Sequence, residues 1–169
     1  MQNNSIIDFT LTYNKFKEPL FNYVIKIVRS EMLAEDIVHN TFMKLYDNLN
    51  HIRNYERIEI WIFTTARNEA FSHFRKKINK YEQDIELIGE KASTENFYNE
   101  LETKELIDIV EKELGRMDPS QSEAYYLKEY SDLSYKKIAE IMNITEDLVK
   151  SRIFKVRQKL RKALINLER

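Results

Sequence analysis

The chain has 169 residues, 27 Lys or Arg against 28 Asp or Glu, a formal net charge of −1, and no cysteine. This length fits one ordinary domain or two small ones. The lack of cysteine excludes a disulfide framework, a thiolate zinc site and a cysteine nucleophile. The beginning of the chain lacks the basic and apolar pattern of a signal peptide, and no segment approaches the roughly 18 apolar residues of a membrane span. We therefore expect a cytoplasmic protein without membrane insertion.

Only 2 Gly and 2 Pro accompany 43% hydrophobic residues, a composition that favours helices with few tight turns and real cores. Charge is segregated along the chain. Residues 53–81 carry 7 basic and 3 acidic groups (net +4), residues 82–123 carry 4 and 13 (net −9), and residues 134–169 carry 10 and 4 (net +6). Two basic blocks that flank an acidic one predict two separate nucleic-acid contacts.

The first two predicted helices show clear apolar spacing. Residues 6–29 form one helix, or two if Pro19 breaks the run. Ser30 can cap the next helix, because its hydroxyl can accept from the first free backbone N–H groups. One face of this helix is apolar and carries Ala34, Val38, Phe42, Leu45 and Leu49. The opposite face is polar, carries Asp36, His39, Asn40, Met43 and Asp47, and by periodicity alone is an ordinary solvated surface.

A polar loop with Arg53, Tyr55 and Arg57 leads into a third helix over residues 59–77. The residues expected to pack inward are Trp61, Ile62, Ala66, Ala70, Phe71 and Phe74. The polar or basic residues of this helix are Arg67, Asn68, Arg75, Lys76 and Lys77. Aromatic and basic side chains that alternate in this way can stack on unpaired bases. The alternative, which we favour for most of the aromatics, is that Trp61, Phe63 and Phe71 fill a three-helix core.

Residues 78–104 are acidic and irregular in period, which predicts a flexible linker with at most short helical pieces. A further helix is expected from about Phe97 to Leu114. Asp118 followed by Pro119 predicts the start of the next helix. The predicted fold is all-α, with two small helical domains, residues 1–80 and 105–169, joined by an acidic linker over residues 81–104.

The last two helices have the spacing of a helix-turn-helix. Ser134 can cap the first helix, Asn143 can end it in the left-handed conformation, and Thr145 can cap the second. A buried stripe is predicted for the second helix at Val149, Ile153, Val156, Leu160 and Leu164. The other side carries Lys150, Ser151, Phe154, Lys155 and Gln158. Seven Lys or Arg and no acidic residue lie between Lys150 and Lys162, a density typical of phosphate binding. A solvated basic face is the alternative, but caps, turn and stripe together favour a DNA-recognition helix.

Three stretches occur in a particular order, AEDIVHNTFMKLY, WIFTTARNEAFSHFRKK and DLSYKKIAEIMNITEDLVKSRIFKVRQKLRKAL. They resemble regions 2.2, 2.3–2.4 and 4.2 of bacterial RNA polymerase sigma factors of the extracytoplasmic-function (ECF) subfamily. The third stretch alone is also typical of other helix-turn-helix regulators, whereas the three together are specific. The resemblance implies that region 2, a helical bundle, docks on core RNA polymerase and opens the −10 promoter element. It also implies that region 4 reads the −35 element.

The resemblance implies roles for individual residues. The polymerase-docking face would consist of Asp36, His39, Asn40 and Met43. Contacts to the −10 element would come from Arg53, Tyr55, Arg57, Arg67, Asn68, Arg75 and Lys76, with the loop residues helping to capture a flipped base. Contacts to the −35 element would come from Lys150, Ser151, Arg152, Phe154, Lys155 and Gln158. An inhibitory anti-sigma factor is a further expected partner.

The chain departs from the family pattern at two places. His39 and Asn40 replace the usual Gln-Glu of region 2.2, so the docking face lacks one expected charge. Asp147 and Leu148 replace the usual Gly-Thr before the recognition residues. An aspartate there would repel phosphate but can accept from a cytosine amino group, which leaves the −35 sequence open.

Two other functions compete with the sigma-factor interpretation. A duplex-binding regulator would use only the helix-turn-helix, and a protein-interaction module would titrate a partner. An enzyme is the weakest interpretation, because the three histidines are scattered and there is no Gly-rich phosphate loop. Glu69 and His73 share a helix face, but this spacing is more typical of a surface pair than of a metal or acid–base site. We predict no catalytic residue, no metal and no cofactor.

Overall fold

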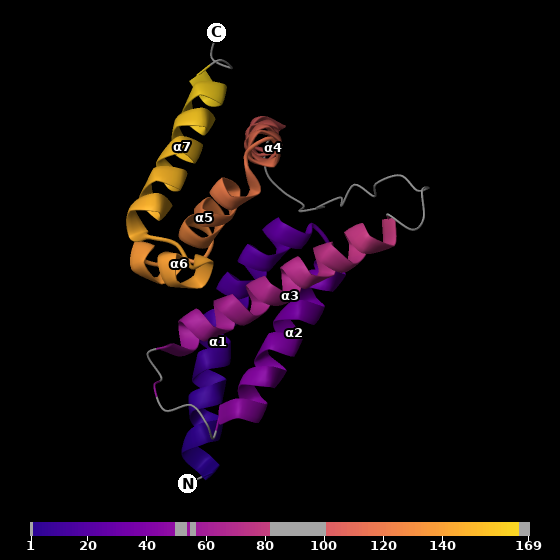
Figure 1. Cartoon of the computed structure of the whole chain (residues 1–169), viewed down its shortest axis with the longest axis vertical. Helices are drawn as coiled ribbons and strands as arrows, with labels where there is room; N and C mark the ends of the chain where they lie inside the picture. Colours follow the sequence, from indigo (N-terminus) through magenta and orange to yellow (C-terminus); the bar gives the residue numbers. More distant parts are fainter. Residues whose placement is uncertain (1, 50–53, 55–56, 82–100, 166–169) are drawn as a thin grey trace. The chain divides into compact units, whose positions relative to one another are not determined.

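The structure is a computed structural model that describes residues 2–49, 54, 57–81 and 101–165. Within these residues the chain forms seven α-helices and no strand, which confirms the all-α fold. The helices are α1 (Gln2–Val28), α2 (Glu31–Asn48), α3 (Ile58–Tyr81), α4 (Leu101–Gly115), α5 (Pro119–Glu129), α6 (Tyr135–Met142) and α7 (Glu146–Ile165) (Figure 1). The chain divides into two compact units, residues 1–92 and residues 93–169, which are described separately below.

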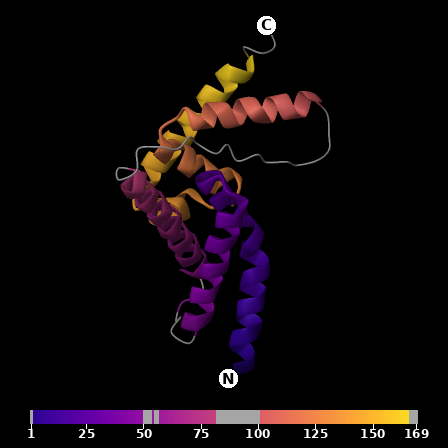
Figure 2. The ribbon, with the colours of Figure 1, turned by 90° about the vertical axis from the view of Figure 1, so that its right-hand side faces the viewer.

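In the first unit, α1, α2 and α3 each pack against the other two, and the three helices can be followed in two views (Figures 1 and 2). The possible break at Pro19 does not occur, because α1 is one helix that contains this proline. Leu20, Tyr23 and Val24, which follow Pro19, are fully buried. Their burial against the neighbouring helices outweighs the local cost of the missing backbone hydrogen bond.

The second helix has the cap and apolar face that its sequence predicts. The Ser30 hydroxyl accepts a hydrogen bond from the backbone N–H of Leu33 at 3.4 Å. Arg29, between α1 and α2, has a left-handed φ of 53°, so the chain turns here without a glycine. The predicted apolar face is buried at Ala34, Val38, Phe42, Leu45 and Leu49.

The third helix packs differently from its predicted pattern. Ile62, Ala66 and Ala70 are fully buried as expected, but Trp61 and Phe74 are each 36% exposed. Phe63 is fully buried, as the core interpretation expected, with its ring centroid 5.8 Å from that of Tyr23 in α1. The buried side of α3 therefore includes Phe63 and excludes Trp61. The expectation that Trp61 and Phe74 pack inward was wrong.

The second unit is built from α4 to α7, with α7 packed against each of the other three helices. Asp118 caps α5 by accepting a hydrogen bond from the backbone N–H of Ser120 at 2.9 Å, and Pro119 occupies the first turn. This confirms the predicted helix start. The largest fully buried side chains of the unit are Leu114, Leu127, Leu133, Ile138 and Ile153.

The segment between the two units falls mostly on residues 82–100, which lie outside the described part together with the expected helix start near Phe97. Tyr81 and residues 101–104, which the sequence assigned to the linker, belong to α3 and α4. Among the described residues, no helix is long and apolar enough to cross a membrane.

Candidate nucleic-acid interface and docking surface

The helix-turn-helix of the second unit is closed by three polar residues. The Ser134 hydroxyl accepts from the backbone N–H of Lys137 at 3.3 Å at the start of α6. Asn143 ends α6 with φ 54° and ψ 50°, the left-handed conformation that turns the chain. The Thr145 hydroxyl then accepts from the backbone N–H of Leu148 at 3.3 Å and caps α7. The predicted helix, turn and helix are confirmed in detail.

One side of α7 is buried and the other is presented to solvent. Val149, Ile153, Val156 and Leu160 are buried as predicted, whereas Leu164 is half-buried near the helix end. The exposed residues of the predicted recognition surface are Lys150, Ser151, Phe154, Lys155 and Gln158, and Arg152 is half-buried. The Phe154 side chain is 60% exposed and lies among basic residues of the same helix. The fold thus leaves an apolar contact point among cations.

Acidic residues at the start of α7 hold the first lysine of this surface. Lys150 Nζ lies 3.2 Å from a Glu146 carboxylate oxygen and 3.7 Å from one of Asp147. The hydrogen bond to Glu146 is the main cause that raises the pKa of Lys150. In the free protein the charge of Lys150 is therefore partly compensated from its own helix.

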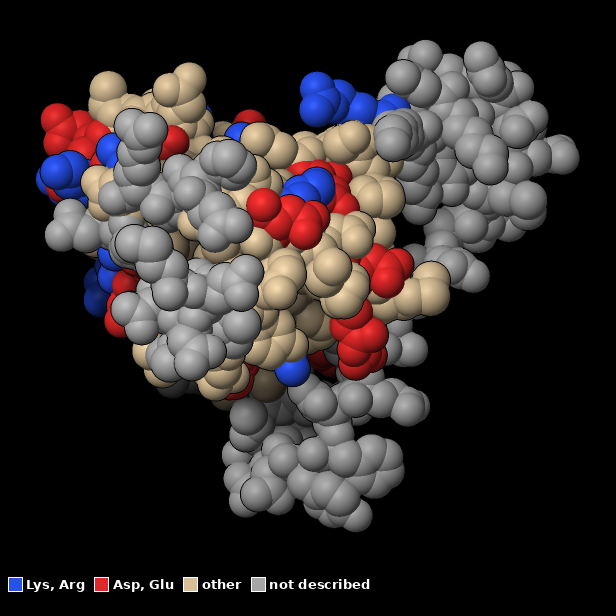
Figure 3. Space-filling model, turned by 90° about the horizontal axis from the view of Figure 1, so that it is seen from below, with Lys and Arg blue, Asp and Glu red and all other residues tan. Residues whose placement is uncertain are grey.

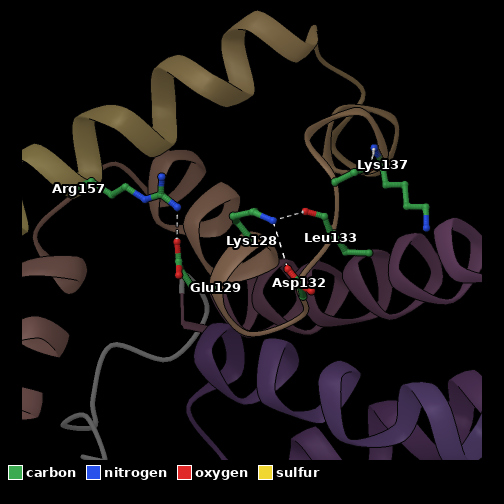
Figure 4. Close-up of polar contacts among 7 residues, drawn as sticks. Lys128, Glu129, Asp132, Leu133, Lys137 and Arg157 are labelled. Atoms are coloured by element: carbon green, nitrogen blue, oxygen red, sulfur yellow. Dashed lines mark hydrogen bonds and ion pairs between the residues drawn. The ribbon is translucent and has the colours of Figure 1, made fainter.

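Arg157 is turned away from this surface and toward α5. Its guanidinium donates a 2.6 Å hydrogen bond to Glu129, and this bond is the main cause that raises the pKa of Arg157 (Figure 4). The neighbouring Lys128 donates to the backbone oxygen of Leu133 at 3.2 Å and lies 3.3 Å from a carboxylate oxygen of Asp132. These contacts join α7 to α5 and close the α5–α6 connection. Arg157 thus has a structural partner within the unit.

In the first unit, α3 carries the predicted basic surface. Asn68 and Arg75 are exposed, and Arg57 is exposed just before the helix. The Arg67 guanidinium lies over the Phe71 ring, 4.9 Å from its centroid, a cation–π contact that restricts the side chain. Arg53 and Tyr55 lie outside the described residues. Lys76 belongs to α3, but the description does not extend to its side chain.

Trp61 is a candidate nucleic-acid contact that sequence reasoning assigned to the core. It precedes Asn68 by seven residues and Arg75 by fourteen, so the three residues share one helix face. Its 36% exposure leaves part of the indole open beside this polar face. The seven-residue spacing was the available signal, and it was outweighed by the expectation that a tryptophan is buried.

The predicted docking face on α2 is exposed as a set. Asp36, His39, Asn40 and Met43 lie on consecutive turns, and all four are exposed. Met43 is 48% exposed, and Met32, one turn before Asp36, is 73% exposed. Met32 was not singled out in the sequence, although it continues the same helix face. The surface therefore alternates flexible apolar side chains with polar ones, a pattern suited to protein contacts.

Glu69 of α3 reaches this face and bonds to α2. One of its carboxylate oxygens accepts from Asn40 Nδ2 at 2.9 Å, and the other accepts from Lys44 Nζ at 2.7 Å. Burial by itself would raise the pKa of the Glu69 carboxyl, but the hydrogen bonds from Lys44 and Asn40 outweigh it and lower the pKa. The sequence paired Glu69 with His73. The hydrogen bonds of Glu69 go to Asn40 and Lys44 of α2, and His73 adds a smaller electrostatic effect that also lowers the pKa of Glu69.

A shallow groove of the second unit lies between α4, α5 and α7. Tyr125 lies at this groove, and burial is the main cause that raises the pKa of its phenol. The groove is lined mostly by apolar side chains, with basic ones among them: Val110, Tyr125, Arg157, Leu160, Arg161, Leu164 and Ile165. Exposed apolar residues on the same helices are Leu106, Ile107 and Ile165.

Charge of both signs is present on the surface of the described residues. On the face drawn in Figure 3, basic and acidic side chains are interspersed with uncharged ones. No three His, Asp or Glu side chains of the described residues lie together in a way that could hold a metal ion.

The chain is thus an all-α protein with two compact helical units, the second of which contains a helix-turn-helix. Residues 12–78 match the family described as Sigma-70 region 2, and residues 107–160 match Sigma-70, region 4. The chain is 31% identical over 156 residues to the ECF RNA polymerase sigma factor SigM of Bacillus subtilis (strain 168), covering 91% of this chain and 93% of SigM. It is 28% identical over 153 residues to the sigma factor SigZ of the same organism, covering 90% and 84%.

One solved structure of a sigma factor is similar to this chain over most of its length. The sigma factor RpoE from Bartonella quintana, in complex with the anti-sigma factor NepR, superimposes with a TM-score of 0.77 at 26% identity, covering 93% of this chain and 96% of RpoE. The chain belongs to the ECF family of RNA polymerase sigma factors. It is therefore a transcription-initiation factor by family, and the members of this family are regulatory subunits rather than enzymes.

Proposed function

We propose that this protein directs core RNA polymerase to promoters by reading a −35 element with α7 and a −10 element with α3, while α2 binds the polymerase. The proposal rests on family membership together with one observation above the others. The exposed side of α7 carries Ser151, Phe154, Lys155 and Gln158 beyond a capped turn. This is the arrangement that places a recognition helix in the major groove.

The chemistry of α7 supports base reading as well as phosphate binding. Gln158 can form a bidentate pair with adenine, and the exposed Phe154 ring can contact a thymine methyl group. Lys155 supplies charge for phosphate, which positions the helix without reading sequence. Asp147 is exposed and lies 3.7 Å from Lys150 Nζ, so a cytosine amino group would compete with that lysine for the carboxylate.

The chemistry of α3 supports contact with melted DNA. Trp61 offers part of an indole for stacking, and Asn68 and Arg75 lie on the same helix face. Stacking on an aromatic side chain contributes about 1–3 kcal/mol per base in single-strand binding proteins. A basic helix with one accessible aromatic residue is suited to the single-stranded part of an open promoter. We assign Arg53, Tyr55, Arg57, Arg67 and Lys76 to the same contact.

Core polymerase and an anti-sigma factor are the proposed protein partners. The face of Asp36, His39, Asn40 and Met43 would bind polymerase, and the groove at Tyr125 would accept an apolar side chain from a protein partner. The relative RpoE is bound to its anti-sigma factor NepR, which makes an inhibitor of this kind a reasonable partner here. Such a protein acts in the cytoplasm, where the polymerase is.

The test is transcription in vitro from a randomised promoter library with core bacterial RNA polymerase, with and without the purified protein, and sequencing of the transcript starts. We expect initiation that depends on added protein and that yields both promoter elements. A matched sample with Phe154→Ala and Gln158→Ala should lose the −35 preference while retaining the −10 preference.

Two results would decide against this function. Absence of protein-dependent initiation, together with tight binding of the free protein to a duplex operator, would favour a conventional helix-turn-helix regulator. Absence of both activities, with retained binding to a protein partner, would favour an interaction module.

A further inference from the structure

Two exposed side chains of α2 are held by one carboxylate of α3. Asn40 and Lys44 lie one helical turn apart, and each donates to a different oxygen of Glu69, at 2.9 Å and 2.7 Å. The Glu69 side chain is only 15% exposed, whereas that of Lys44 is 53% exposed. The acceptor is therefore largely covered while its donors remain on the surface.

We propose that Glu69 is a positioning residue of the polymerase-docking face, which holds Asn40 and Lys44 in one arrangement before the polymerase binds. This inference rests on the proposed function, because it assigns that face to polymerase. It also extends the docking surface from α2 onto α3, since Lys44 and Glu69 become part of it.

The hydrogen bond to Glu69 fixes how the Asn40 amide is oriented. Because the amide NH₂ donates to Glu69, its oxygen Oδ1 is directed away from that bond and remains an acceptor. Among the described residues, the Asn40 side chain hydrogen-bonds to Glu69 through its NH₂ group. The Asp36 carboxylate lies one turn away on the same helix face. The face thus presents neighbouring acceptors, and it fits a polymerase surface that carries N–H donors such as arginine.

The arrangement matters for affinity because long side chains lose rotamer freedom when a partner binds. Lys44 has four rotatable side-chain bonds, and its ion pair with Glu69 already restricts them. Ordering that takes place before binding does not reduce the binding affinity. If the Glu69–Lys44 contact were only an ordinary surface ion pair, its loss would have little effect on binding to polymerase. A positioning role for Glu69 predicts a measurable loss of affinity instead.

The experiment measures equilibrium binding of the full-length protein to core RNA polymerase for the parent and for Glu69→Gln. A glutamine has one acceptor oxygen in place of two, so either Asn40 or Lys44 loses its partner. We expect about tenfold weaker binding, equivalent to the ordering of one or two long side chains. In the free protein, the side-chain amide ¹⁵N–¹H signals of Asn40 should shift at the same time, because their acceptor has changed.

Two matched variants separate positioning from charge and from folding. Glu113→Gln on α4 removes the same charge and also breaks an exposed ion pair, the 2.8 Å contact with Arg116 just after the helix, and it should bind polymerase like the parent. Asn40→Asp combined with Glu69→Gln exchanges amide and carboxylate without changing size or net charge, and it keeps a hydrogen bond between the two helices. This double variant should recover binding to within about twofold, since Lys44 retains a carboxylate at i,i+4 spacing.

Several outcomes would overturn the inference. Binding by Glu69→Gln within twofold of the parent would remove the positioning role and leave the proposed function standing. Equal losses for Glu69→Gln and Glu113→Gln would show a general charge effect. If Glu69→Gln lowers the thermal midpoint so far that its binding reflects unfolding, the double variant decides, and failure to recover would count against the inference. A parent protein that does not bind core polymerase would overturn the proposed function itself.

Discussion

Arg157 of α7 and Glu129 of α5 form a 2.6 Å hydrogen-bonded ion pair that joins the recognition helix to its support (Figure 4). The two residues are 28 positions apart in sequence. Both side chains are partly exposed, at 52% and 36%, so the pair contributes in the range of about 0.2–1 kcal/mol expected for exposed ion pairs. Arg157 is therefore engaged within the unit, whereas Lys155 belongs to the exposed recognition surface.

We predict that Lys155→Ala mainly affects DNA binding, whereas Arg157→Ala mainly affects the stability of the protein. Lys155→Ala should lower DNA affinity and reduce the slope of log K against log salt by about 1, because one phosphate contact is lost. Arg157→Ala should lower the free energy of unfolding by up to about 1 kcal/mol and leave the salt slope nearly unchanged. DNA titrations at several salt concentrations, with urea denaturation, measure both quantities. A larger slope change for Arg157→Ala would assign the phosphate contact to that residue instead.

Phe154→Ala should weaken sequence-specific binding without loss of stability. The side chain is 60% exposed, so its removal should change the free energy of unfolding by less than about 0.5 kcal/mol. A lost thymine contact should reduce discrimination at one base pair of the −35 element by about 1–3 kcal/mol. Competition binding with single-base variants of the selected −35 element identifies the base pair that Phe154 contacts. Ile153→Ala is the matched contrast, because Ile153 is buried and its removal should destabilise the unit.

Asp147→Asn should increase non-specific DNA affinity. Asp147 lies 3.7 Å from Lys150 Nζ and is itself exposed. The substitution removes a negative charge that would repel DNA phosphate, and it also removes one of the ion-pair partners of Lys150. We expect a salt slope larger by about 1 and a changed preference at the base pair facing the helix start. Filter binding to random-sequence duplex, compared with the selected element, measures both. Unchanged affinity and preference would place this end of α7 away from DNA.

The left-handed turn at Asn143 should tolerate glycine but not alanine. Asn143 has φ 54°, and a Cβ without a polar group costs about 1–2 kcal/mol in this conformation. Asn143→Ala should therefore lower the free energy of unfolding by about 1 kcal/mol, whereas Asn143→Gly should leave it unchanged or raise it slightly. Thermal and urea unfolding of the two variants provide the comparison. Equal stability of the two variants would show that the turn relaxes to another conformation.

The Glu69 network should make the first unit less stable in acid. The pKa of Glu69 is lowered below its ordinary value of 4.5 in the folded protein. Its contribution to stability is thus fully present above the unfolded pKa and is lost as pH falls through the lower, folded value. The parent should be more stable than Glu69→Gln near pH 7, and the difference should shrink below about pH 4.5. Thermal midpoints by circular dichroism from pH 7 to pH 3 test this; a difference that stays constant would exclude the linkage.

Local chemistry was sufficient to predict much of the fold. Ser30, Ser134 and Asn143 act within a few residues of their own positions, so their caps and turn could be predicted from sequence. Regular apolar spacing likewise predicted the buried sides of α2 and α7. Pro19 was ambiguous, because its local cost favours a break while the burial of Leu20 favours a continuous helix. That balance depends on packing, which spacing alone does not give.

The sequence by itself determined the all-α fold, the helix-turn-helix, and the resemblance that the Sigma-70 matches confirm. Tertiary structure alone decided which exposed groups act together. It paired Glu69 with Asn40 and Lys44, turned Arg157 toward Glu129, and left Trp61 partly exposed while Phe63 is buried. The reason is physical. Caps and helical periodicity involve neighbours within about one turn, whereas these pairings depend on the angle and register at which separate helices pack.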